Sequence, residues 1–107
     1  MIIMNRFCKF GKLQAIKGEG KTLLDILLKA SEELQTEETC FCYIVGMSQE
    51  EPDGVYVYEV WEDKAAHENS LKLEPVKELI QEAMPILDFS KSTNYPDLTI
   101  YGGKANF

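Results

Sequence analysis

The chain has 107 residues, of which 45% are hydrophobic and 27% are charged, and its formal net charge is −7. This size and composition are typical of one folded domain, residues 1–107, with one core. The negative charge makes nucleic acid and anionic membrane surfaces poor partners. No segment approaches the roughly 20 apolar residues that span a bilayer, and the first residues lack the apolar core of a signal peptide. We therefore expect a cytoplasmic protein that has no membrane partner.

The chain has three cysteines, Cys8, Cys40 and Cys42, an odd number that predicts reduced thiols. Cys40 and Cys42 lie two positions apart on a predicted strand, where side chains point the same way but do not readily form a disulfide. Together with His67 they would give a metal ion three ligands, whereas a structural zinc site needs about four. The sequence therefore predicts no metal site, and it leaves the role of the thiols open.

The first half of the chain predicts a strand, a helix and a second strand. Loose alternation over 8–16 indicates a strand, which ends at the glycine-rich turn 17–20. Apolar residues at helical spacing follow over 21–36, and Thr22 with Asp25 resembles a capping box at the start of this helix. Residues 39–45 are β-branched and aromatic, which is typical of a strand.

The second half predicts a hairpin, two helical segments and a last strand. Residues 46–54 contain a Pro-Asp-Gly turn, which joins the preceding strand to a strand over 55–62. Asp63 can cap a helix that starts at Lys64. Pro75 suits the first turn of a further helical segment, which Pro85 interrupts. A last strand is expected at 98–101.

The order strand, helix, strand, strand, helix, strand is the split βαβ pattern of a ferredoxin-like α+β fold. In that fold an antiparallel sheet of four strands carries both helices on one face, so its other face needs cover. Tyr56, Tyr58 and Val60 would lie on this open face with alternate residues of 40–45. Because an apolar patch of that size is rarely left to water, we expect a homodimer that pairs two sheets face to face.

The strand over 55–62 is the most informative segment, because both of its faces are largely apolar. Alternation assigns one face to Val55, Val57, Glu59 and Trp61, and the other to Tyr56, Tyr58, Val60 and Glu62. The first face combines a carboxylate with an indole, which makes it the candidate wall of a ligand site. The alternative is that Trp61 is a packing anchor and that Glu59 is paired with a basic neighbour.

Several segments resemble the antibiotic biosynthesis monooxygenase domain, especially its small quinol monooxygenases. They are EVWEDKAAH at 59–67, Ser70-Leu71, Val76 with Ile80, AMPI at 83–86, the turn Gly18-x-Gly20 and the strand motif Cys40-x-x-Tyr43. The resemblance covers residues 8–103. It implies a dimeric α+β barrel of two ferredoxin-like chains. It also implies oxidation of phenols or quinols by molecular oxygen without metal, flavin or haem.

By this resemblance, a small aromatic substrate and molecular oxygen would meet in a pocket between the sheet and the helices. His67 and Trp61 would be catalytic: His67 would accept or relay the phenolic proton, and Trp61 would form a stacking wall and a donor. Glu59 could orient His67 or a water. Tyr43 and Tyr58 would contact the substrate, although alternation places Tyr58 on the opposite strand face from Trp61. Alternatively, His67 is an exposed or structurally bonded residue.

The sequence departs from the haem-degrading relatives of this fold, which carry an Asn on the first strand and a His about ten residues after the Trp. Here the first strand reads CKFGK at 8–12, without an Asn, and Leu71 rather than His stands ten residues after Trp61. Haem cleavage is therefore not expected. The predicted function is a cofactor-independent monooxygenase that oxidises a quinol or similar aromatic polyphenol. The alternatives are a non-catalytic dimeric module that binds a small apolar or aromatic ligand, and a structural dimerisation domain with a filled interior.

Overall fold

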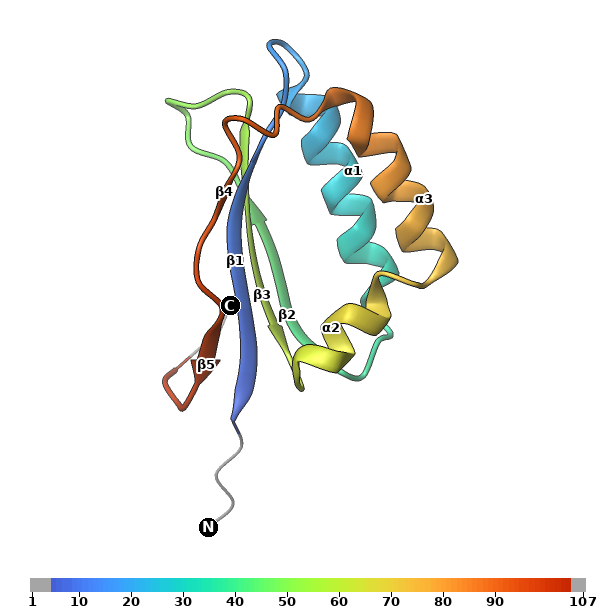
Figure 1. The fold of residues 1–107 in the computed structure, drawn as a ribbon, viewed down its shortest axis with the longest axis vertical. Coiled ribbons are helices and arrows are strands. Elements are labelled where there is room, and N and C mark those ends of the chain that lie inside the picture. Colours follow the sequence, from blue (N-terminus) through green and yellow to red (C-terminus); the bar gives the residue numbers. More distant parts are fainter. Residues whose placement is uncertain (1–4, 105–107) are drawn as a thin grey trace.

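The computed structural model describes residues 5–104 as an antiparallel sheet with helices on one face (Figure 1). In chain order the elements are β1 (Arg6–Gln14), α1 (Gly20–Glu33), β2 (Cys40–Gly46), β3 (Gly54–Trp61), α2 (Lys64–Ser70), α3 (Glu74–Ala83), the 3-10 helix η1 (Met84–Ile86), β4 (Thr93–Asn94) and β5 (Leu98–Ile100). The predicted ferredoxin-like α+β class is confirmed. No helix in this described part of the chain is long and apolar enough to cross a membrane.

The sheet order is β2-β3-β1-β4, and β5 also pairs with β1. Every pair is antiparallel, so β1 and β2 run the same way with β3 between them, and α1 makes the crossover of a split βαβ unit. The central place of β3 explains its two apolar faces, since each face is covered by something different. Its register places Glu59 opposite both Lys9 and Tyr43.

The core lies between the sheet and the helices, and the alternation predicted for β3 is confirmed. Val55 and Trp61 are fully buried on the helix-covered face, whereas the Tyr58 ring contacts Phe10 on the open face. One buried cluster joins the sheet to α1 and α3 and contains Ala15, Leu23, Ile26, Leu27, Val55, Val57 and Ala83. A second cluster, of Leu34, Trp61 and Val76, lies towards the other end of the sheet.

The start of α1 differs from the prediction, because no capping box forms there. The helix already begins at Gly20, so Thr22 lies inside its first turn and cannot be the cap. A remote residue takes that role: Asp53, in the β2–β3 loop, accepts from the backbone N–H groups of Gly18 at 3.2 Å and Gly20 at 2.9 Å. The loop approaches so closely that a Cβ on Gly20 would lie 2.0 Å from the Pro52 carbonyl oxygen.

The predicted start of the next helix is confirmed. The Asp63 carboxylate accepts from the Ala66 N–H at 2.8 Å and caps α2. Pro75 lies in the first turn of α3, and Pro85 lies in η1 directly after it. Two separate helices, α2 and α3, therefore occupy the place of the second helix in the ferredoxin-like pattern.

The prediction that Cys40 and Cys42 point the same way is wrong. A β-bulge places Cys40 opposite Trp61 and Cys42 opposite Val60, on different faces of the sheet, because Phe41 is inserted between them. The three cysteines are free thiols. Across residues 5–104, no three His, Cys, Asp or Glu side chains gather where they could hold a metal ion.

Candidate active site

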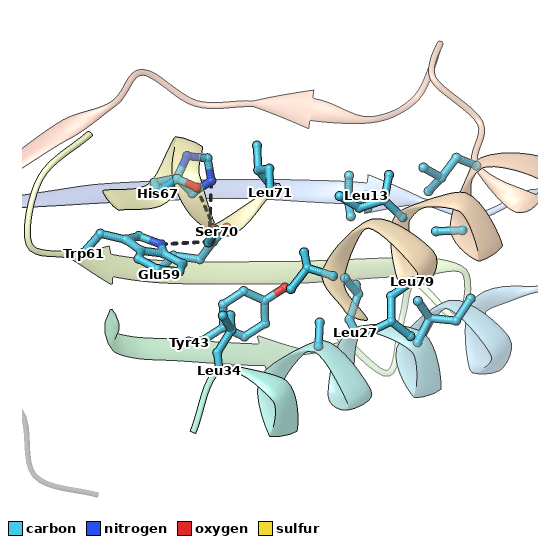
Figure 2. A pocket seen from close by; sticks show the side chains of 16 residues that line it. Leu13, Leu27, Leu34, Tyr43, Glu59, Trp61, His67, Ser70, Leu71 and Leu79 are labelled. Carbon is cyan, nitrogen blue, oxygen red and sulfur yellow. Dashed lines mark hydrogen bonds and ion pairs between the residues drawn. The ribbon is translucent and has the colours of Figure 1, made fainter. Parts of the chain in front are cut away.

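A cavity of about 240 Å³ lies between the helix-covered face of the sheet and the three α-helices (Figure 2). Most of its wall is aliphatic and consists of Leu13, Ile26, Leu27, Ala30, Leu34, Leu71, Val76, Leu79, Ile80, Ala83 and Leu87. Its polar lining consists of Tyr43, Glu59, Trp61, His67 and Ser70, and Figure 2 shows the last four together at one end. A ligand there would meet apolar walls and one polar end.

The pleat of β3 points Glu59 and Trp61 into this polar end together. The Trp61 indole donates to Glu59 Oε1 at 3.0 Å, and His67 Nε2 lies 3.8 Å from the same oxygen. The second distance exceeds hydrogen-bond range, so Glu59 and His67 are neighbours without a direct bond. The Trp61 and His67 rings meet edge to face, with 5.7 Å between their centroids. The structure thus brings three predicted site residues together.

His67 is placed by α2, although that helix is short. The cap at Asp63 fixes where α2 begins, and the Ser70 hydroxyl donates to the His67 carbonyl oxygen at 2.6 Å. The His67 ring contacts the rings of both Trp61 and Phe7, and the Phe7 ring centroid is 5.8 Å away. Only 11% of the His67 side chain is exposed. Ring packing therefore holds the imidazole, while the Ser70 hydrogen bond is made to the His67 backbone.

Burial dominates the electrostatics of this pair. It raises the pKa of Glu59, and the opposing effects of the Trp61 hydrogen bond and the Lys9 charge do not cancel it. Burial also lowers the pKa of His67, assisted by Lys9 and opposed by Asp97 and Glu68. Both shifts favour the uncharged form of the group. The site therefore favours a neutral imidazole beside a carboxylate that takes a proton more readily than an exposed one.

Tyr43 adds a hydroxyl group from the neighbouring strand. It lines the cavity from β2, at the position paired with Glu59, and its ring points into the cavity in Figure 2. Burial, and then the charge of Glu59, raise the pKa of this hydroxyl, so it stays protonated. Among the described residues it has no hydrogen-bond partner. Nearby, burial raises the pKa of Cys40 to about 11, which makes a thiolate nucleophile at that position unfavourable.

Tyr58 is the predicted site residue that the structure does not bring to the cavity. It lies on the open face of the sheet, where its ring centroid is 6.0 Å from that of Phe10. The reason is the strand period of two, which separates it from Glu59. Sequence reasoning missed Ser70, which lines the cavity three residues after His67; helical spacing could have found it.

Residues 6–82, more than half of the chain, match the family described as antibiotic biosynthesis monooxygenase. The chain therefore belongs to the antibiotic biosynthesis monooxygenase family. The match covers β1 to α3, and with them every residue of the polar end of the cavity. A comparison with curated proteins found no match.

Solved structures share the fold along almost their whole length. A candidate antibiotic biosynthesis monooxygenase from Chloroflexus aurantiacus superposes with a TM-score of 0.75 at 22% identity, covering 95% of this chain and 97% of its own. Protein SO0527 from Shewanella oneidensis gives 0.78 at 16% identity, with coverage of 94% and 95%. Another antibiotic biosynthesis monooxygenase gives 0.73 at 15% identity, with coverage of 92% and 99%. At these identities the likeness establishes the fold.

Proposed function

We propose that this protein is a monooxygenase that oxidises a quinol or a similar aromatic polyphenol with molecular oxygen. The observation that carries the proposal is the cavity itself, which has aliphatic walls and a polar end where Glu59, Trp61 and His67 meet. Membership of the family supports the reaction class.

The size of the cavity favours a substrate of one or two fused rings. Its volume of about 240 Å³ is below the roughly 300–1,000 Å³ of pockets for drug-sized ligands. Trp61 forms the aromatic wall of this space and holds Glu59, while His67 and Tyr43 are within the lining as partners for substrate hydroxyl groups. The fully buried position of Trp61 suits a rigid wall.

The proposed chemistry needs a phenolate in a dry space. Removal of the hydroxyl proton leaves an electron-rich ring, which transfers one electron to oxygen to give a phenoxyl radical and superoxide. These combine at a ring carbon, and the peroxide takes back one proton and loses water to leave an oxygenated quinone. One oxygen atom enters the ring and the other leaves as water, so the substrate loses four electrons. The aliphatic wall keeps solvent from the intermediates.

The direct test is oxygen consumption with menadiol, a two-ring quinol. We expect a rate above autoxidation for the wild-type protein and a clear fall for His67→Ala, because this change removes a polar partner from the site. Glu62→Ala, also exposed and outside the cavity lining, is the matched control and should behave like wild type. If the wild-type rate equals autoxidation, the enzymatic proposal fails.

A non-catalytic module for a small aromatic ligand would use the same cavity. It predicts saturable quenching of Trp61 fluorescence by naphthoquinones together with no turnover of the quinol. Because the chain has one tryptophan, the signal reports on the polar end alone. Binding without turnover would favour this second function over the first.

We also propose that two copies of the chain pair through the open face of the sheet. Phe10 stacks on Tyr95 with 4.9 Å between ring centroids and also contacts Tyr56 and Tyr58. Ile44 lies on the same face, and 36% of its surface is exposed. Figure 1 shows the helices on the other side of the sheet, so this aromatic face has no helix to cover it. A second copy offers the same apolar face in return.

A further inference from the structure

We infer that Glu59 is the catalytic base of this site: its unpaired carboxylate oxygen takes the hydroxyl proton of the bound arene, and His67 acts beside it as a neutral hydrogen-bonding group. The inference rests on the proposed function and deepens it. It assigns to Glu59 the proton transfer that the family resemblance implied for His67.

The geometry of the Glu59 carboxylate distinguishes its two oxygens. Oε1 accepts the Trp61 indole N–H at 3.0 Å and is the oxygen that His67 approaches. Oε2 has no hydrogen-bond partner among residues 5–104. In that range every side-chain oxygen without a partner is accessible, so Oε2 is not sealed inside the protein. Because Glu59 lines the cavity, Oε2 is open to a molecule held there. Trp61 thus fixes one oxygen and leaves the other for the substrate.

The two candidate bases, Glu59 and His67, would carry different charges after the transfer. A carboxylate that takes a proton becomes neutral, whereas an imidazole that takes one becomes a cation. The exposed fractions of the Glu59 and His67 side chains are 15% and 11%, so both sites penalise charge. Burial therefore drives proton uptake by Glu59 and opposes it at His67. The negative charge moves from the carboxylate into the aromatic ring, where it is delocalised.

One fixed positive charge and two neutral groups surround the pair. Lys9 faces the pair from β1, paired with Asp97 at 3.2 Å, while Cys40 and Tyr43 face it from β2 as neutral groups. The Lys9 charge opposes proton uptake by Glu59, but it also favours the phenolate that forms beside Glu59. Because the proton moves from the substrate to Glu59 inside the site, the net charge of the site is the same before and after the step.

The step is balanced as a proton transfer. The O–H bond of the substrate breaks, an O–H bond forms on Glu59 Oε2, and the electron pair stays on the substrate oxygen. Glu59 then holds the proton that the peroxide needs when it loses water, so it is regenerated as a carboxylate. This is general base and then general acid catalysis by one residue.

Binding of 4-nitrophenol tests the transfer without any turnover, because its phenolate absorbs at a longer wavelength than the neutral phenol. In a titration from about pH 5 to pH 6.5, where the free phenol is mostly neutral, we expect the wild-type protein to raise the phenolate absorbance on binding as Glu59 becomes ionised. His67→Gln and the exposed control Glu62→Gln should also raise it. Glu59→Gln keeps an acceptor for Trp61 but cannot take a proton, so its bound phenol should stay neutral.

Phenolate formation in Glu59→Gln, or none in the wild-type protein, would overturn the inference. Turnover of menadiol gives a second readout. We expect Glu59→Gln to lose about 10²–10⁴-fold in rate, the usual contribution of a general base. The fall in rate at low pH, which is the acid limb of the pH profile and reflects protonation of Glu59, should also disappear in this variant. His67→Gln should keep that limb. If no variant turns over any quinol, the proposed reaction fails, while the nitrophenol result still decides whether Glu59 takes the proton.

Discussion

At the scale of single residues, the site depends on a carboxylate that is costly to bury. Glu59 is held by the Trp61 indole and is largely buried, and this burial raises its pKa. A raised pKa means that the folded protein holds this proton more tightly than the unfolded chain does. Stability contributed by Glu59 is therefore greatest below the unfolded pKa, and it falls as the pH rises through the folded pKa. At neutral pH the ionised Glu59 therefore lowers the stability of the folded protein.

Glu59→Gln should therefore raise the melting temperature by a few degrees at pH 7 to 8, because it removes the ionisation but keeps the acceptor for Trp61. The gain should vanish below about pH 4, where both states of the wild-type protein are protonated. His67 has a lowered pKa and costs stability at acid pH, but it does so in both proteins and cancels in the difference. Thermal melts across this pH range give the measurement. If the Glu59→Gln protein is less stable than wild type at pH 8, the predicted direction of the stability change is wrong.

Ile80→Trp should weaken quinol turnover several-fold through a higher KM, since Ile80 lines the cavity and is 40% exposed, which places it at the opening. Leu28→Trp is the matched control: Leu28 is 44% exposed on α1 and does not line the cavity. Steady-state kinetics of both variants make the comparison. Equal KM values for the two variants would show that substrate does not enter past Ile80.

At the scale of elements, local signals were readable from the sequence and remote ones were not. Asp63 caps α2 three residues away, and the alternation of β3 placed Glu59 and Trp61 on one face. The cap of α1 comes from Asp53, more than 30 residues later, and only the fold brings it there. Likewise, the bulge at Phe41 is set by pairing with β3. The cavity depends on how α2 and α3 pack, which no short-range pattern specifies.

Gly20→Ala should cost about 2–3 kcal/mol of unfolding free energy, because the added Cβ would collide with the Pro52 carbonyl and the Asp53 backbone. The clash falls on backbone atoms, so no side chain can rotate away. Gly46→Ala meets nothing within 4 Å and should change stability by less than about 0.5 kcal/mol. Urea denaturation of both variants separates the two cases. Equal stabilities would mean that the β2–β3 loop is not locked onto α1.

At the scale of the whole molecule, the two faces of the sheet have different tasks. The helix-covered face encloses the cavity, and the open face presents the aromatic contacts around Phe10 together with Ile44. If the open face pairs two chains, each subunit keeps its own cavity on the outer side of its sheet. Dimerisation would then stabilise the sheet without closing the site.

Ile44→Lys should convert the proposed dimer into monomers, because it would bury a charge between the paired faces. Leu28→Lys introduces the same charge on the exposed side of α1 and should leave the dimer intact. Sedimentation velocity at matched concentrations gives the masses. A wild-type protein that sediments as a monomer would contradict pairing through this face.

The central claim is that the cavity places a phenolate against molecular oxygen and that the protein is a monooxygenase. The most direct measurement is the mass of the product formed from menadiol under ¹⁸O₂. We predict one labelled oxygen atom per product molecule, with the second recovered as labelled water, and loss of the label from the product in Glu59→Gln. A product that carries no label, with oxygen recovered as hydrogen peroxide, would contradict the claim.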